Sequence, residues 1–364
     1  MTSSLNISFF GSSLVSAYWN GAATYYRGLV RALHERGHRI TFYEPDAFER
    51  QEHRDMADPD WARVVVYPAN EEAALRAVAA ARGSDLVLKA SGVGVFDELL
   101  ERAVLELQSP EACVAFLDVD APATLDRIQN DPADPFCALI PQYDLILTYG
   151  GGQPVVSAYL AAGARECVPI YNALDPHTHH PAPPDPRFAA DLGFLGNRLP
   201  DREARVEEFF LNAAAQLPSR RFLLGGNGWQ DKAVPPNVKY LGHVYTHEHN
   251  AFNATPLAVL NINRGSMARY GFSPPTRVFE AAGAGACLIT DQWEGIELFL
   301  EPGRQVLVAA SGDGVADHLE QLTPGRARAI GQAAGKRILS EHTYAHRANQ
   351  LEQVLAGNLE KAMP

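Results

Sequence analysis

Residues 270–304 read YGFSPPTRVFEAAGAGACLITDQWEGIELFLEPGR, and this stretch decides how the second half of the chain folds. Two prolines stiffen its first loop, and we expect a short helix over about residues 276–284, with Thr276 able to cap its N-terminus. The small residues that follow let a helix pack close to a sheet, and we expect a buried strand over residues 287–290. The stretch therefore predicts a helix–strand unit of an α/β fold.

The start of this expected helix carries side chains that suit a nucleoside diphosphate. Helix N-termini bind phosphate through free N–H groups and the helix dipole. Arg277 would add a permanent charge in the first turn, and the Glu280 carboxylate could accept hydrogen bonds from a ribose diol. A structural alternative stays open, in which Glu280 is a solvated helix residue and Arg277 pairs with it across the turn.

The motif RVFEAAGAGACLITD, followed by EPGR, resembles the donor-binding segment of GT-B glycosyltransferases, in particular the CgeB-like (spore maturation protein) family. In the wider retaining GT-B families two glutamates lie eight positions apart here, and the second, which contacts the donor ribose, corresponds to Glu280. The first falls on Phe272, which is not acidic and fits the CgeB-like pattern. The resemblance implies an α/β fold of GT-B architecture, with two Rossmann-like βαβ domains facing an interdomain cleft and a C-terminal helix crossing back to the first domain.

Length and composition narrow the class of protein. The 364 residues suffice for two domains, and no apolar run approaches the ~20 residues of a membrane span. The first residues, MTSSLNISFFGSS, lack a basic region, so we expect no signal peptide. A net charge of −12 argues against general nucleic-acid binding. Four scattered cysteines indicate buried free thiols and favour a cytoplasmic location.

The first half of the chain alternates strands and helices from residue 5 onward, beginning with a strand–loop–helix–strand unit of the Rossmann kind. The stretch NGAATYYRGLVRALHERGHRITFYE resembles the opening of a GT-B N-terminal domain. The expected acceptor-side loop comprises Gly11, Ser12, Trp19, Asn20 and Gly21. Asp118 and Asp120 follow a strand and are the candidate general base of an inverting reaction, although Asp120 before Ala-Pro-Ala-Thr is also a natural helix N-cap.

We expect an N-terminal, acceptor-side domain over residues 1–172 and a proline-rich linker over 173–186. The C-terminal, nucleotide-sugar-binding domain is expected over 187–342, followed by the returning helix over 343–364. Three histidines of the linker invite a metal site. We expect none, because flexible proline-rich segments rarely preorganise ligands and no second cluster is apparent.

Strand ends of the C-terminal domain supply further candidates. Arg198 and Arg202 lie in a glycine-containing loop before a helix, which suits phosphate, while a plain helix start capped by Asp201 explains them equally well. A glycine turn at 225–228 and the NRG motif at 263–265 end two other strands. The predicted donor-binding set is Glu280, Arg277, Thr276, Phe279, Arg264, Asn263, Arg198, Asn197, Gly226, Asn227 and Asp291.

The resemblance implies a glycosyltransferase that moves a hexosyl or related group from a nucleoside diphosphate sugar to an unidentified small-molecule, glycan or protein acceptor in the interdomain cleft. UDP- and dTDP-sugars are the expected donors, with no metal and no cofactor. A nucleotide-sugar epimerase on the same scaffold and a non-catalytic nucleotide-sugar-binding protein stay open as alternatives.

Overall fold

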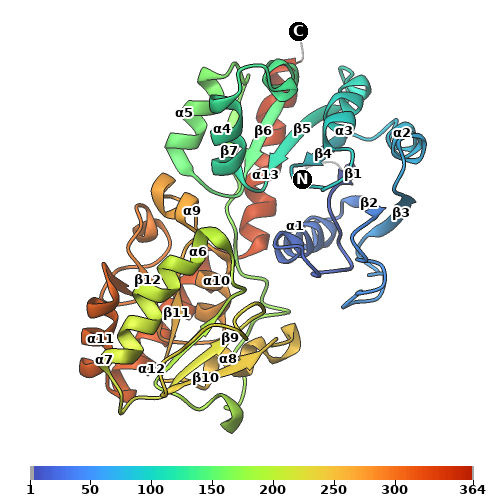
Figure 1. Ribbon diagram of the computed structural model, residues 1–364. Helices are drawn as coiled ribbons and strands as arrows, with labels where there is room; N and C mark the ends of the chain where they lie inside the picture. Colours follow the sequence, from blue (N-terminus) through green and yellow to red (C-terminus); the bar gives the residue numbers. More distant parts are fainter. Residues whose placement is uncertain (1–3, 363–364) are drawn as a thin grey trace. The chain divides into compact units, whose positions relative to one another are not determined.

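The computed structural model describes residues 4–362 and contains two compact units. Unit 1 runs to Asn172 and resumes at Tyr344, and unit 2 comprises Ala173–Thr343. Each unit is built around one parallel β-sheet with helices packed on it (Figure 1). This confirms the α/β class with two Rossmann-like halves.

The sheet of unit 1 has seven strands in the order β3-β2-β1-β4-β5-β6-β7. Every pairing is parallel. Its central strands are buried along their length, as expected for a sheet covered on both faces. The strands are β1 Asn6–Phe10, β2 Arg39–Asp46, β3 Arg63–Pro68, β4 Leu86–Ala90, β5 Cys113–Asp118, β6 Leu145–Thr148 and β7 Cys167–Pro169.

The helices of unit 1 include the last helix of the chain, which packs on the first. A Cβ on Gly28 of α1 would lie 2.1 Å from the Tyr344 ring of α13, so only glycine permits this contact. Glu352 of α13 accepts hydrogen bonds from Arg36 and lies 2.9 Å from Nε2 of His38. The helices are α1 Ala23–Glu35, α2 Glu71–Ala80, α3 Asp97–Ala103, α4 Ala121–Asn130, α5 Gly152–Ala161 and α13 Tyr344–Ala362.

The sheet of unit 2 has six parallel strands in the order β10-β9-β8-β11-β12-β13. The order reverses direction between β8 and β11, and the carboxyl ends beside such a switch point are where open α/β sheets bind ligands. The strands are β8 Leu192–Leu195, β9 Phe222–Gly225, β10 Val238–Gly242, β11 Ala258–Asn261, β12 Leu288–Asp291 and β13 Leu307–Ala309.

The helices of unit 2 enclose a core of buried aliphatic and aromatic side chains, which the strands and helices α6, α7, α11 and α12 contribute. A π-helical turn, Glu207–Leu211, joins two of them. The helices are α6 Pro200–Val206, α7 Asn212–Gln216, α8 His249–Ala254, α9 Gly265–Tyr270, α10 Thr276–Gly283, α11 Gly312–Gln321 and α12 Pro324–Glu341.

The proline-rich segment that was predicted as a linker packs against the surface of unit 2. The backbone N–H of Leu174 donates to the carbonyl of His342, and the Leu174 side chain fills the space beside Gly283. Further along, Asn250 donates to the Thr178 carbonyl. The apolar Leu174 side chain and the hydrogen bond from Asn250 hold the segment against α10 and α8, which the high proline content alone did not reveal.

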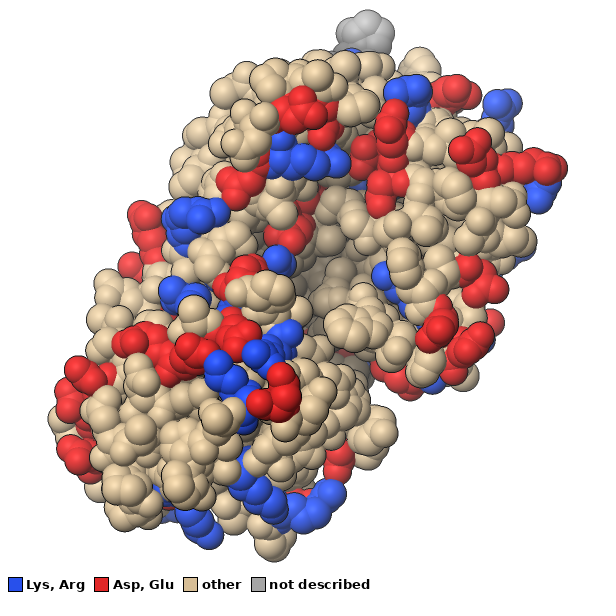
Figure 2. Space-filling view, in the orientation of Figure 1, with Lys and Arg blue, Asp and Glu red and all other residues tan. Residues whose placement is uncertain are grey.

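No helix within residues 4–362 combines the length and the apolar character that crossing a bilayer requires. Acidic and basic side chains are interspersed on the face drawn in Figure 2. That face therefore lacks the continuous basic surface that a nucleic-acid backbone favours.

Candidate functional site

The carboxyl ends of β8, β9, β11 and β12 bring most of the predicted donor-binding residues to one edge of the unit 2 sheet. The loops after β8 and β9 are tied together, since Arg198 N–H donates to the Asn227 carbonyl (2.9 Å) and Asn227 N–H donates to Oδ1 of Asn197 (2.9 Å). Gly226 has φ +115°, and a Cβ there would lie 2.3 Å from the Gly196 carbonyl oxygen. Glycine is thus required by the approach of the two loops.

The two arginines of the loop after β8 have different surroundings. Arg198 is neutralised by ion pairs with Glu203 (2.7 Å) and Asp231 (2.9 Å). Arg202, in the first turn of α6, has a buried Nε without a hydrogen-bond partner among the described residues. Burial and the charges of Arg264 and Arg277 lower its pKa, although Asp201 and Asp291 oppose them. Of the two arginines, Arg202 is the one suited to an anion.

Asp291 and Asn263 hold the end of β11 rather than a ligand. Asp291 is fully buried, and its carboxylate accepts hydrogen bonds from the Asn263 N–H and from Arg205 (2.5 Å). Asn263 Oδ1 accepts from Asn261 (3.0 Å), while its Nδ2 is buried without a partner in the described part of the chain. Arg264 pairs with Asp201 (2.7 Å). The prediction that Asp291 faces sugar hydroxyls does not match these contacts.

The N-cap of helix α10 lies one residue before the expected cap. Pro275 is the N-cap residue, and Thr276 is the first helical residue, whose hydroxyl hydrogen-bonds Glu280 instead of capping the helix. Phe279 is completely buried and packs edge-on against Phe299, with ring centroids 5.6 Å apart, so it belongs to the core. The predicted contact of Phe279 with the donor therefore has no support in this geometry.

Arg277 and Glu280 form the charged pair of this helix. Arg277 Nη1 lies 3.4 Å from Oε2 of Glu280 and donates to Oδ1 of Asn253 (3.2 Å). This is the pairing of the structural alternative, but Glu280 is only 5% exposed and is not a solvated residue. Burial alone would raise the pKa of Glu280. The neighbouring His179, Arg277 and His249 outweigh it and lower that pKa to about 2.

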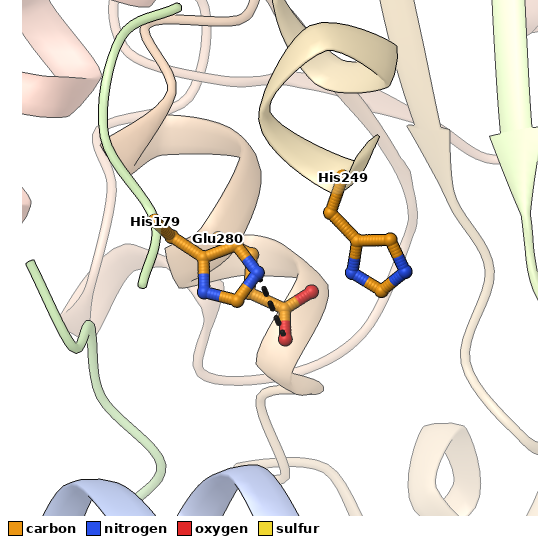
Figure 3. A group of neighbouring side chains, drawn as sticks. All are labelled: His179, His249 and Glu280. Carbon is orange, nitrogen blue, oxygen red and sulfur yellow. Dashed lines mark ion pairs between the residues drawn. The ribbon is translucent and has the colours of Figure 1, made fainter. Parts of the chain in front are cut away.

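Two histidines flank Glu280, and neither was among the predicted site residues. Figure 3 shows its carboxylate between the imidazole rings of His179, from the proline-rich segment, and His249, the first residue of α8. His179 Nε2 lies 3.9 Å from Oε1 of Glu280. Burial lowers the pKa of His179 and lowers that of His249 to about 4, so both rings are neutral at pH 7. No local sequence signal joins residues this far apart.

In unit 1 the expected acceptor-side loop is held by its own polar residues. Ser12 donates to Oδ1 of Asn20 (2.8 Å), and Asn20 donates to the carbonyls of Ser13 and Ser16. Gly11 is buried against Phe42 and Gly21 is exposed. Trp19 is 68% exposed, with φ +48°. Of the five predicted loop residues, Trp19 and Gly21 therefore present accessible surface.

Asp118 is buried and fully engaged. It accepts hydrogen bonds from Tyr159 (2.5 Å), Ser91 (2.8 Å) and Thr124 (3.1 Å), and burial raises its pKa. A carboxylate enclosed in this way organises the loop after β5, which conflicts with the predicted role of a general base. Asp120 is partly exposed and occupies the N-cap position of α4, without a side-chain capping hydrogen bond.

Residues 202–353 match the model of a family described as "Glycosyl transferase-like". The search of curated proteins found no match to this chain. Among solved structures, Anabaena HepE in complex with UDP and glucose matches with a TM-score of 0.70 at 14% identity, covering 97% of this chain and 100% of that one. Sucrose-phosphate synthase from Thermosynechococcus elongatus matches with a TM-score of 0.72 at 13% identity, covering 98% and 100%.

An α-glucosyltransferase in complex with UDP and DNA matches with a TM-score of 0.70 at 10% identity, covering 97% of this chain and 100% of that one. These matches confirm the predicted GT-B fold. The family match shows similarity to glycosyltransferases over residues 202–353, which is less than half of the chain. The matched family is broader than the CgeB-like branch, and the match does not distinguish that branch.

Proposed function

We propose that the protein is a glycosyltransferase that binds a nucleoside diphosphate sugar at the carboxyl edge of the unit 2 sheet. The observation that carries this proposal is an arginine beside an ionised, buried carboxylate. Arg277 Nη1 lies 3.4 Å from Oε2 of Glu280, and the charge of Arg277 also helps to lower the pKa of Arg202. A diphosphate needs a positively charged side chain to bind it, and the ribose hydroxyls need a hydrogen-bond acceptor such as this carboxylate.

In this function Arg202 and Arg277 would bind the diphosphate and stabilise the charge that develops as the sugar leaves. The ionised Glu280 would accept hydrogen bonds from the ribose hydroxyls. Because the chain supplies the positive charge itself, we propose that transfer needs no metal ion. UDP is the preferred nucleotide, since relatives of the same fold are seen with UDP or UDP-glucose.

The stretch GFSPPTRVFEAAGAG supports placing the protein in the CgeB-like branch, since Phe272 stands where wider families have a glutamate. If the reaction inverts the anomeric centre, Asp120 is a better candidate base than Asp118, because it is partly exposed and Asp118 is enclosed by donors. The acceptor would be recognised by unit 1, where Trp19 offers an exposed aromatic face.

Nucleotide binding tests the donor half of the proposal. Calorimetric titrations of the full chain with UDP, dTDP, GDP and ADP, in chelator-treated buffer, should give binding to UDP or dTDP. Incubation with the corresponding sugar nucleotide should then release free nucleotide slowly by hydrolysis. A folded protein that binds none of these nucleotides would overturn the proposal. Tight binding without any turnover would instead favour the non-catalytic binding protein.

A further inference from the structure

The side chains of His179, His249 and Glu280 converge in unit 2, although they come from three separate segments. One potential ligand atom of each lies within 4.8 Å of the others (Figure 3). Glu280 and His179 are almost fully buried, and His249 is partly buried. The cluster is thus a defined interior feature and not an incidental gathering of surface residues.

The hydrogen bonds around each histidine determine which ring nitrogen bears the proton. The Thr178 hydroxyl donates to the Asp175 carbonyl (3.2 Å), so its oxygen is left to accept from Nδ1 of His179 (3.0 Å). Nε2 of His249 lies 3.3 Å from the Val244 carbonyl, which can only accept. With Thr178 donating to Asp175, the proton lies on Nδ1 of His179, and the Val244 carbonyl places the proton of His249 on Nε2.

Two nitrogens remain, Nε2 of His179 and Nδ1 of His249. Each carries a lone pair and no proton. Both are buried and neither has a hydrogen-bond partner among the described residues. They face a carboxylate, which is also an acceptor when ionised. Arg277 and the Thr276 hydroxyl contact the carboxylate, but the lone pairs of the two imidazole nitrogens are left unsatisfied, which is unfavourable for buried acceptors. The two imidazole nitrogens therefore lack a cation or a polar hydrogen among the described residues.

The chemistry of the three groups matches a metal better than any other single ligand. Two neutral imidazoles and one carboxylate are a frequent ligand set for Zn²⁺, usually with water in the fourth position. Each ring is also oriented by a hydrogen bond from its other nitrogen, as metal-bound histidines generally are. Arg277 contacts Oε2 of Glu280 and leaves Oε1, the oxygen nearest His179, available. The positive charge of Arg277 should moderate the affinity.

We propose that His179 Nε2, His249 Nδ1 and the Glu280 carboxylate form a binding site for a first-row divalent cation, with Zn²⁺ preferred. We further propose that the bound ion competes with the donor nucleotide, because both use the carboxylate of Glu280. This second part rests on the proposed function, whereas the metal site stands without it. Zn²⁺ would then inhibit the enzyme, and chelators would leave its activity unchanged or raise it.

Metal binding can be measured without any enzymatic readout. Metal-free protein is titrated with Zn²⁺ in competition with a chromogenic chelator, and Co²⁺ is added separately to record the visible absorption typical of four-coordinate Co²⁺. We expect one ion per chain. His249→Ala should weaken Zn²⁺ binding by more than the roughly 10–100-fold that loss of a second-shell partner causes. His247→Ala, two residues away on exposed surface, is the matched control and should bind like wild type.

Equal Zn²⁺ affinity in wild type and His249→Ala would overturn the metal site, as would the absence of stoichiometric binding to wild type. Because His249→Ala could disturb folding, His179→Gln provides a second test, and circular dichroism and thermal unfolding must show that each variant is folded. Loss of metal binding in both folded variants, with retention in His247→Ala, is the expected result.

The competition is tested by titrating UDP into wild type and His249→Ala, with Zn²⁺ and with chelator. Zn²⁺ should weaken UDP binding to wild type only, and the variant corrects for any Zn²⁺ that UDP itself binds. Unchanged or stronger UDP binding in the presence of bound Zn²⁺ would overturn the competition but leave the metal site. If UDP fails to bind even with chelator, the proposed function fails, and the Zn²⁺ titration still decides the metal site.

Discussion

Replacing Arg202 by methionine separates its proposed function from any structural role. The substitution keeps an unbranched side chain but removes a guanidinium whose Nε is buried and unpartnered in the described structure. Burial and two neighbouring arginines already disfavour that charge. The nucleotide-free variant should therefore be at least as stable as wild type, while its affinity for UDP should fall.

The size of the loss follows from the contacts that a guanidinium makes with phosphate. Each charge-assisted hydrogen bond contributes about 1.5–3 kcal/mol, and a bidentate contact contains two of them. We take the lower end, a loss of about 3 kcal/mol, because water replaces part of the contact, and this corresponds to a roughly 150-fold increase in Kd.

Arg198→Met is the matched control, since both arginines follow the same strand. Arg198 is engaged by Glu203 (2.7 Å) and Asp231 (2.9 Å), so its charge is already satisfied. Its loss should change both the free energy of unfolding and the UDP affinity little, as for other exposed ion pairs.

Calorimetric titration measures the UDP affinity of wild type, Arg202→Met and Arg198→Met. Denaturant unfolding without nucleotide measures their free energies of unfolding. An Arg202→Met protein that is destabilised but binds UDP normally would refute the reasoning, because Arg202 would then be a structural residue. Equal losses of UDP affinity in both variants would show that the ion pairs of Arg198 do not keep it from the nucleotide.

Three further predictions follow from single residues. Glu280→Ala should weaken UDP binding in chelator-treated buffer by about 2 kcal/mol, or roughly 30-fold, and unchanged calorimetric affinity would remove Glu280 from the site. Gly28→Ala would place a Cβ 2.1 Å from the Tyr344 ring, so denaturant unfolding of unit 1 should show a loss of about 1–3 kcal/mol; Gly325→Ala has open space around it and should be neutral or stabilising. Burial raises the pKa of Glu101 from 4.5 to about 7, so its stabilising contribution is complete below the lower value and is lost as pH rises through the higher one. Wild type should therefore lose about 2–3 kcal/mol relative to Glu101→Gln between about pH 5 and pH 8, and parallel stability curves would contradict this.

Much of the fold could be predicted because its signals are local. The rhythm of strands and helices, the glycine turns and the amphipathic last helix all lie within windows of a few turns. Helix α10 was expected over residues 276–284 and occupies Thr276–Gly283. Its cap was misassigned, because proline before threonine leaves the N-cap position to Pro275 and frees the Thr276 hydroxyl for Glu280.

The candidate site was predicted less completely, because its details depend on partners that are distant in sequence. The loop before α6 suggested both Arg198 and Arg202 as phosphate ligands, but only Arg198 entered the predicted donor-binding set. The structure favours Arg202 instead, because Arg198 pairs with Asp231, a carboxylate that follows another strand. Asp118 was a candidate base because it follows a strand in the sequence. In the structure, the hydroxyl of Tyr159 from helix α5 donates a hydrogen bond to its carboxylate.

The sequence by itself determined the α/β class, the two Rossmann-like halves and the segment around Arg277 and Glu280, because side-chain periodicity and turn chemistry act between near neighbours. Only the tertiary structure decided that His179 and His249 flank Glu280. A hundred residues separate the ends of that cluster, and no local pattern specifies which lone pairs converge. Packing of the proline-rich segment against α8 and α10 brings them together, and the neighbouring hydrogen bonds then set which nitrogens face the carboxylate.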